Sequence, residues 1–384
     1  GTQVQAKIDY IFLGHQSEGK NYTIEGEPVT ASNEKNISEL AEKSIEVLIT
    51  ASERISARSI AMSYFRSAIY DKAIENFLKL QEIQPDDPDA RYMVATCYLN
   101  MDSTEKALGL YKQLLEQTDP NYVPALELLA KTYFAQNDFQ NALTYYSKLT
   151  QIKPDEYNYH QYAAYVLLRL EKTVEALSEF DKAVAIRDDS PEMRFQLGVV
   201  EYNLAKSIEK TDAAGYKSHL EHDLQSLDKA IEMLRQKQEM DETQKKMLAD
   251  CLYYKGSTLQ SLDRRQEALD AFNGIFSIQP DYQNAFYAYF NMGRIANDMK
   301  KNEEALKYYR EAVKTAPAGT NVWSFHQNIG QIYARINDSR NAVEAFSEAL
   351  KTAPGENQGT LFFLRGINYY DLGQELDFSN REDV

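Results

Sequence analysis

Residues 328–354 read NIGQIYARINDSRNAVEAFSEALKTAP and contain the pattern that decides the fold. Apolar residues recur in this segment at three- and four-residue spacing, which is the period of an amphipathic helix. A small residue, Gly330, is followed 12 positions later by Ala342, and Phe346 comes one helical turn after that alanine. Pro354 closes the segment, where it would stop a second helix. The segment therefore predicts two antiparallel helices that approach closely at their small residues.

The same pattern recurs along most of the chain. An alanine followed four residues later by an aromatic residue occurs seven times, and Ala230 with Leu234 forms a weaker eighth copy. Successive alanines lie 34, 35, 34, 54, 38, 37 and 37 residues apart. One helical hairpin cannot bury its own apolar face, so a period of this length predicts a stacked array of hairpins. The seven strong copies are Ala73/Phe77, Ala107/Tyr111, Ala142/Tyr146, Ala176/Phe180, Ala268/Phe272, Ala305/Tyr309 and Ala342/Phe346.

The repeat resembles the tetratricopeptide repeat family, and the resemblance covers about residues 54–354. It implies an all-α fold, a right-handed superhelical solenoid of about eight helix-turn-helix units with capping helices at both ends. The predicted parts are an irregular N-terminal arm (1–33), an N-terminal capping helix (34–53), units 1–4 with the first helix of unit 5 (54–202), an insertion in unit 5 (203–222), the rest of unit 5 with units 6–8 (223–354), and a C-terminal capping helix with a tail (355–384).

Unit 5 departs from the pattern. Gly198 and Ala230 are 32 residues apart, whereas the corresponding residues of the other units are 12 apart. The extra residues, 203–222, either lengthen both helices up to a turn near residues 211–215 or form a separate lobe. Their richness in helix-forming residues favours the longer helices.

Composition and charge limit the partners. The net charge of -16 and the pI near 4.9 disfavour binding to nucleic acid, whose phosphates the average surface would repel. No run of 18 apolar residues is present, which argues against a membrane-spanning segment. Cys97 and Cys251 fall in apolar helical patterns and are expected to be buried, unpaired core residues.

The start of the sequence, Gly1-Thr2-Gln3, lacks a methionine. This start suggests a chain trimmed after a signal peptide, so we expect a periplasmic or cell-envelope location, with the cytoplasm as the alternative. The many Asn, Gln and Tyr residues fit a bacterial source.

Motifs for catalysis are missing from the sequence. The five histidines include no His-Glu-x-x-His pair, and neither strands nor a glycine-rich phosphate loop are predicted. His219 and His222 share one helix face, but a stable metal site usually needs three or four ligands. We therefore expect no enzymatic activity, no cofactor and no metal site.

The resemblance does predict a binding surface. In the tetratricopeptide family, side chains of the first helix of each unit line the inner surface. Those positions hold aromatic residues, six basic residues and five acidic ones here, a net charge of +1 against -16 for the whole chain. The candidate partner-binding residues are Arg58, Arg66, Tyr92, Lys131, Phe134, Tyr165, Arg169, Phe195, Tyr202, Tyr253, Tyr287, Phe290, Arg294 and Arg335.

Aromatic and arginine side chains are typical of binding hot spots. The sequence thus favours a non-enzymatic scaffold or adaptor that binds peptide segments of partner proteins in its concave groove. Alternatives are a glycan- or peptidoglycan-binding envelope protein and an accessory subunit of an enzyme complex. The same rings can instead pack between neighbouring helices. The open ends of such an array leave room for a homo-oligomer.

Overall fold

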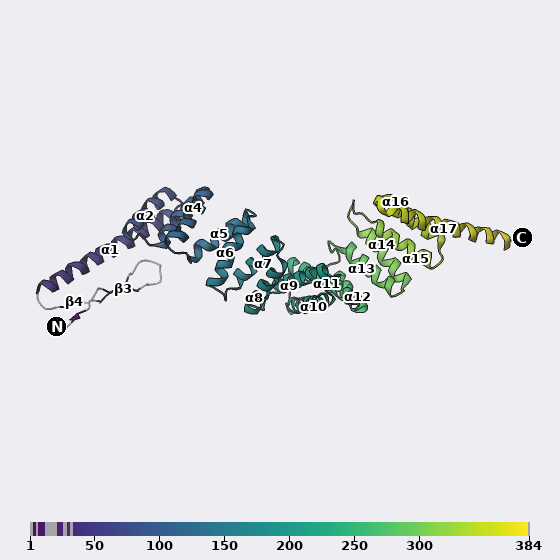
Figure 1. The fold of residues 1–384 in the computed structure, drawn as a ribbon, viewed down its shortest axis with the longest axis horizontal. Coiled ribbons are helices and arrows are strands. Elements are labelled where there is room, and N and C mark those ends of the chain that lie inside the picture. Colours follow the sequence, from purple (N-terminus) through teal and green to yellow (C-terminus); the bar gives the residue numbers. More distant parts are fainter. Residues whose placement is uncertain (1–2, 5–6, 12–20, 26–28, 31–33, 383–384) are drawn as a thin grey trace. The chain divides into compact units, whose positions relative to one another are not determined.

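The computed structural model describes residues 3–4, 7–11, 21–25, 29–30 and 34–382. These residues form seventeen helices and four short strands (Figure 1). The chain divides into two compact units, residues 1–152 and 153–384, called here the N-terminal unit and the C-terminal unit. Successive helices pair as eight hairpins followed by a last single helix, which confirms the predicted all-α repeat fold.

The helices of the N-terminal unit form the first three hairpins. They are α1 (Glu34–Arg66), α2 (Tyr70–Ile83), α3 (Pro88–Asn100), α4 (Thr104–Gln117), α5 (Val123–Ala135) and α6 (Phe139–Ile152).

The C-terminal unit holds the other five hairpins and the last helix. Its helices are α7 (Tyr157–Arg169), α8 (Thr173–Ile186), α9 (Pro191–Ile208), α10 (Ala213–Arg235), α11 (Glu242–Ser261), α12 (Arg265–Ile278), α13 (Ala285–Asp298), α14 (Asn302–Thr315), α15 (Trp323–Arg335), α16 (Ser339–Thr352) and α17 (Gly355–Glu382). The predicted tail after the capping helix is thus itself helical as far as Glu382, and only residues 383–384 lie outside the described residues.

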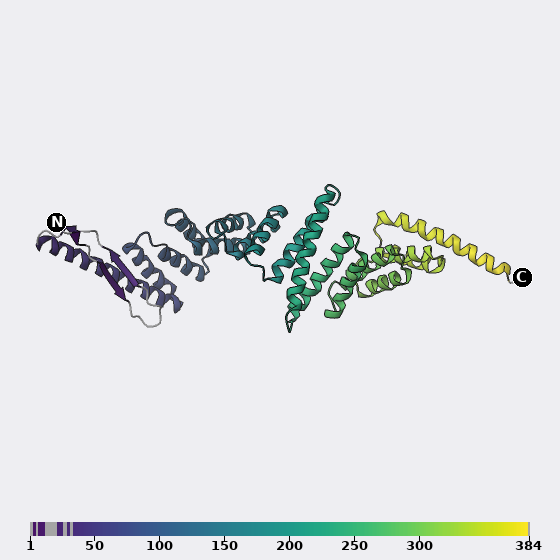
Figure 2. The ribbon, with the colours of Figure 1, turned by 90° about the horizontal axis from the view of Figure 1, so that it is seen from below.

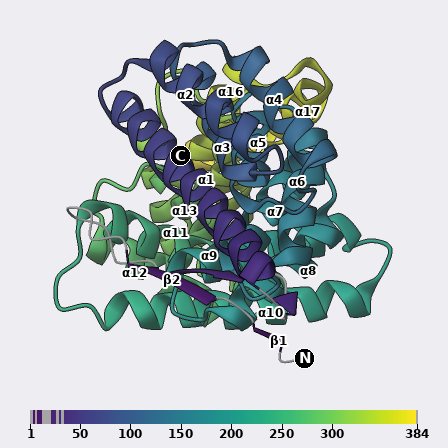
Figure 3. The same cartoon turned by 90° about the vertical axis from the view of Figure 1, so that its left-hand side faces the viewer.

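Two predictions for the N-terminal unit need correction. Residues 34–53 were expected to form a capping helix separate from the first helix of unit 1, but α1 is one continuous helix of 33 residues, visible as the long purple helix in Figure 3. The sequence between residues 34 and 66 contains neither glycine nor proline. Nothing in it therefore ends a helix at residue 53.

The N-terminal arm was expected to be irregular, with an ordered arm, a small hairpin and a floppy tail left open for residues 9–30, and the structure shows paired strands instead of an irregular arm. Strand β2 (Lys7–Ile11) pairs antiparallel with β3 (Asn21–Glu25), and β1 (Gln3–Val4) pairs with β4 (Val29–Thr30). The stretch NYTIE and the first four residues of KIDYI alternate polar with apolar or aromatic residues, which is the two-residue period of a strand. Backbone pairing of these stretches satisfies their amide and carbonyl groups.

Each hairpin closes through the residues that define the repeat. The alanine of the second helix and the large residue four positions later are at most 1% exposed in all eight hairpins. In four hairpins the small residue of the first helix is glycine, and in three of these a Cβ atom there would lie 2.7–2.8 Å from the opposing ring. The pairs are Gly256 with Phe272, Gly293 with Tyr309, and Gly330 with Phe346.

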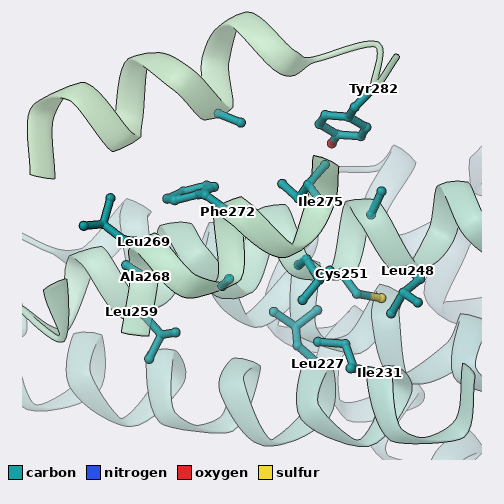
Figure 4. Close-up of a cluster of buried hydrophobic side chains, with 14 of the residues drawn as sticks. Leu227, Ile231, Leu248, Cys251, Leu259, Ala268, Leu269, Phe272, Ile275 and Tyr282 are labelled. Carbon is teal, nitrogen blue, oxygen red and sulfur yellow. The ribbon is translucent and has the colours of Figure 1, made fainter. Parts of the chain in front are cut away.

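The rings and small residues belong to continuous apolar clusters. Figure 4 shows one of them, where Leu227 and Ile231 of α10, Cys251 of α11 and Phe272 of α12 converge. Cys251 and Cys97 are both buried and unpaired, as predicted, and burial raises the pKa of the Cys97 thiol to about 11. Such thiols stay protonated and unreactive at neutral pH. Among the helices described, none has the length and apolar content needed to cross a bilayer.

The turn inside a hairpin usually contains one residue in the left-handed region. In seven of the eight hairpins a non-glycine residue there has φ between +56° and +60°. These residues are Ala68, Asp102, Asn137, Glu171, Asp263, Lys300 and Asn337.

Replacing Ala68 with glycine is expected to raise the free energy of unfolding of the N-terminal unit by about 0.5–1 kcal/mol, because glycine adopts positive φ without a steric cost from Cβ. Ala57→Gly, inside α1, is the control and should lower it by about 1 kcal/mol. Urea denaturation followed by circular dichroism measures both. Effects of the same sign would contradict the assigned turn geometry.

Candidate binding site

The residues inserted in unit 5 lengthen both of its helices. α9 has 18 residues and α10 has 23, whereas the two helices of the preceding hairpin have 13 and 14. They run side by side as the long teal-green pair in Figure 2. The turn between them lies at residues 209–212, and the Asp212 carboxylate caps α10 by accepting a 2.9 Å hydrogen bond from the Gly215 amide. Of the two alternatives for residues 203–222, the structure therefore shows the longer helices.

A cavity of about 540 Å³ lies beside this extension in the C-terminal unit. It is bounded by α9, the start of α10, α11 and α13, so first helices of three successive hairpins contribute most of its wall. We call it the tyrosine cavity. Its lining residues are Tyr202, Asn203, Lys206, Glu209, Tyr216, Tyr253, Tyr254, Ser257, Gln260, Ser261, Asn291 and Arg294.

The two cations of the tyrosine cavity differ in whether they have an ion-pair partner. The Lys206 ammonium lies 2.8 Å from the Glu209 carboxylate and 5.4 Å from the centre of the Tyr216 ring. Among the described residues, the Arg294 guanidinium has neither a hydrogen-bond nor an ion-pair partner. The cavity thus carries a net charge of +1, with the unpaired cation on α13, in a chain whose net charge is -16.

The tyrosines supply ring faces and neutral hydroxyl groups. Tyr254 packs edge-on against Tyr202 at 5.8 Å between ring centres, and against Tyr253 at the same distance. Burial raises the pKa of Tyr253 to about 12 and also raises that of Tyr202. These hydroxyls therefore stay protonated at neutral pH and can donate hydrogen bonds to a ligand.

Beneath the cavity, two histidines of α10 contact a buried carboxylate of α9. Glu201 is 4% exposed and accepts from the Nδ1 atom of His219, while His222 Nδ1 lies 3.5 Å from its other oxygen. Burial raises the pKa of Glu201, and the contact with His219 acts in the opposite direction. Across the described residues, no group of three or more histidine, cysteine or carboxylate side chains, these three included, has an arrangement that could hold a metal ion. The histidine pair therefore serves to satisfy Glu201.

Three of the fourteen predicted site residues line the tyrosine cavity: Tyr202, Tyr253 and Arg294. Six other aromatic candidates pack against neighbouring rings within their own unit. This agrees with the alternative given for them from the sequence, in which such rings fill space between helices. These pairs are Tyr92 with Tyr111, Phe134 with Phe139, Tyr165 with Phe180, Phe195 with Tyr254, Tyr287 with Phe286, and Phe290 with Phe325.

The remaining basic candidates lie elsewhere on the repeats. Arg58 pairs with Asp89 at 2.5 Å, Lys131 lies 3.7 Å from Glu127, and Arg335 donates to Asn297 and Asn302 at 2.6 Å each, while Arg66 and Arg169 are exposed.

Several lining residues were not predicted. Lys206, Glu209 and Tyr216 belong to the inserted turns, which have no counterpart in the other units and therefore no position in the repeat. The density of tyrosine around residues 202–216 and 253–261 was a signal that could have identified them.

The fold and the cavity together define a helical-repeat protein of the interaction-scaffold class. Residues 66–149 match the family described as anaphase-promoting complex, cyclosome, subunit 3, and residues 127–191, 286–318 and 324–356 match tetratricopeptide repeats. The matched segments cover half of the chain. The chain belongs to the tetratricopeptide repeat family, whose members generally bind protein partners and carry no enzymatic activity.

Similar proteins extend the comparison. The outer dynein arm-docking complex subunit 4 of Danio rerio is 29% identical over 91 residues, which are 24% of this chain and 18% of that protein. The structure of PilF from Pseudomonas aeruginosa has a TM-score of 0.44 at 14% identity, covering 62% of this chain and 96% of that one. A tetratricopeptide repeat structure from Cytophaga hutchinsonii has a TM-score of 0.41 at 18% identity, covering 77% and 95%.

Proposed function

We propose that this chain is a scaffold that binds an extended peptide segment of a partner protein in the tyrosine cavity. The supporting observation is that one cavity is lined by tyrosine rings, by side-chain amides without hydrogen-bond partners and by one cation without an ion-pair partner. A volume of about 540 Å³ lies within the usual range for binding pockets, about 300–1000 Å³.

The amide side chains suit a peptide backbone. Among the described residues, Asn203 and Gln260 have no hydrogen-bond partner, so each offers one carbonyl acceptor and two N–H donors. An extended peptide carries an unpaired N–H and C=O at nearly every residue, and burying these groups without partners is costly. Side-chain amides can pair with both kinds of group at once.

The rings and the cation suit the side chains of the same segment. Tyrosine and arginine are enriched where a few residues supply most of the binding free energy. Arg294 lies at the rim with its guanidinium free, whereas Lys206 is already engaged by Glu209. Arg294 is therefore the cation that a bound segment would meet first.

Selection from a random linear peptide library tests the proposal. We expect the wild type to select peptides, and the Asn203→Ala/Arg294→Ala variant to bind them at least about 10-fold more weakly, which corresponds to about 1.4 kcal/mol. Lys307→Ala, an exposed cation of α14 outside the cavity, is the control and should bind as the wild type does.

Two results would contradict the proposal. One is a set of peptides that binds the wild type and the double variant equally, because the peptide site would then lie elsewhere. The other is binding of glycan or peptidoglycan fragments at the cavity with no peptide selected, which would support the envelope-binding alternative.

A further inference from the structure

The last helix, α17, is apolar on two opposite sides. Leu361 is fully buried against the cluster formed by α16, and Asn368 is 5% exposed on the same side. On the opposite side the large side chains are exposed: Phe362 by 52%, Phe363 by 68% and Tyr370 by 68%. Large apolar side chains that gather on one exposed face mark an interaction surface. The outer side of α17 is therefore an uncovered contact surface.

This outer side follows a seven-residue repeat. Glycines alternate along it with pairs of aromatic residues, and spacings of three, four and seven residues place all of them on one helix face. We call this surface the glycine–aromatic face. Its residues are Gly359, Phe362, Phe363, Gly366, Tyr369, Tyr370 and Gly373.

Gly366 occupies the repeat position at which the glycines of the preceding first helices pack against an aromatic ring of the second helix. It lies 36 residues after Gly330, which itself lies 37 after Gly293. A Cβ atom at Gly330 would lie 2.7 Å from the Phe346 ring, whereas one at Gly366 would have nothing within 4 Å. The glycines at 359 and 373 are equally open. α17 therefore presents unfilled sockets of the kind that a second helix fills in the repeats.

The same helix also carries the ring that such a socket accepts. In the second helices of the repeats a small residue is followed four positions later by an aromatic one. α17 repeats this spacing twice, as Gly359 with Phe363 and Gly366 with Tyr370. One helix thus combines the sockets of a first helix with the rings of a second helix, so its outer face is complementary to itself.

We propose that two copies of this chain associate through the glycine–aromatic faces of their α17 helices, antiparallel and related by two-fold symmetry. First and second helices are antiparallel in every repeat hairpin, and a self-complementary surface gives an isologous pair. The aromatic pairs of one copy then seat against glycines of the other, as knobs enter holes.

The available area is sufficient for this association. Phe362, Phe363, Tyr369 and Tyr370 are 52%, 68%, 54% and 68% exposed. Taking about 200 Å² for a fully exposed aromatic side chain, the four rings offer about 480 Å² per copy and about 1000 Å² per pair. That total reaches the size expected of a specific interface, about 1000 Å². The Arg365 guanidinium, 5.2 Å from the Phe362 ring centre and 6.0 Å from that of Tyr369, restrains both rings beforehand.

Gly366→Ala tests the proposal without threatening the fold. Within one copy the new methyl group meets nothing within 4 Å, and alanine favours the helix more than glycine does. In the pair it fills the socket. Sedimentation equilibrium over a range of concentrations should show a dimer for the wild type and a dissociation constant at least about 10-fold higher for Gly366→Ala. Gly109→Ala, at an exposed position of α4 with equally open surroundings, is the control and should dimerise as the wild type does.

Tyr370→Ala removes a ring instead of filling a socket and should weaken the dimer as well. Circular dichroism at equal concentration confirms that each variant is folded. A wild type that stays monomeric throughout would overturn the proposal, and so would a dimer that Gly366→Ala and Tyr370→Ala leave unchanged, because its contact would then lie elsewhere.

Discussion

Replacing Phe272 with alanine is expected to lower the free energy of unfolding of the C-terminal unit by about 3–5 kcal/mol. Phe272 is fully buried within the cluster of Figure 4. Its ring covers Gly256 of the opposing helix, with ring carbons 2.8–2.9 Å from where a Cβ atom would be. Its loss leaves a cavity between α11 and α12. Urea denaturation followed by circular dichroism measures the effect.

The opposing glycine gives this prediction a sharper form. In the wild type, Gly256→Ala should destabilise by about 1–3 kcal/mol, because the methyl group collides with a ring that has no room to move. In the Phe272→Ala background the same methyl group enters the vacated space and improves helix propensity, so it should stabilise by about 1 kcal/mol. The effect of one substitution therefore changes sign with its partner.

Gly109→Ala serves as the control here too, because a Cβ atom at Gly109 on α4 meets nothing within 4 Å. It should be neutral or stabilising by up to about 1 kcal/mol in either background. If Gly256→Ala destabilised equally in both backgrounds, ring and glycine would not form the contact described.

This contact also explains why so much of the fold could be predicted. A ring that requires a small residue opposite it leaves a paired signature at fixed spacing, as Gly330 with Phe346 does, and this signature recurs clearly enough to place both helices of each unit. The start of α1 could not be placed in this way. Residues 34–53 carry no repeat signature, and only the lack of a breaking residue shows that they continue into the first helix.

The candidate site was predictable only where it follows the repeat. Tyr202, Tyr253 and Arg294 occupy first-helix positions that the family resemblance assigns to the inner surface. Tyr216 lies on the extension of α10, and its place beside Lys206 depends on how two lengthened helices cross the cavity. The repeat period of the sequence cannot predict how these two helices cross, because only one hairpin of the chain is lengthened.

A buried acid beneath the tyrosine cavity was likewise not apparent from the sequence. Asp223 of α10 is fully buried; its Oδ2 atom accepts a hydrogen bond from the Thr258 hydroxyl, and its Oδ1 atom has no partner among the described residues. Burial raises the pKa of Asp223 to about 8, and the nearby carboxylates of Glu201 and Asp228 act in the same direction. Residue 223 directly follows the inserted residues 203–222, where the spacing of the repeat is broken, so the repeat pattern did not indicate that it is buried.

The raised pKa makes the stability of the C-terminal unit depend on pH. Asp223 stays protonated in the folded chain up to about pH 8, whereas in the unfolded chain it ionises near pH 4. The folded state therefore binds one more proton between these values, so the stability that this group contributes is complete below pH 4 and is lost as the pH rises toward 8. The limiting slope is about 1.4 kcal/mol per pH unit.

Asp223→Asn keeps the size and polarity of the side chain but cannot ionise. The wild type should lose about 2–3 kcal/mol relative to this variant between pH 5 and pH 7, measured by urea denaturation at each pH, because every other group titrates in both proteins. Asp281→Asn, at an exposed aspartate of the C-terminal unit that does not contribute to the pKa of Asp223, should follow the wild type. A constant difference between the wild type and Asp223→Asn would mean that Asp223 is ionised in the folded chain, and that water or a cation reaches its unpaired oxygen.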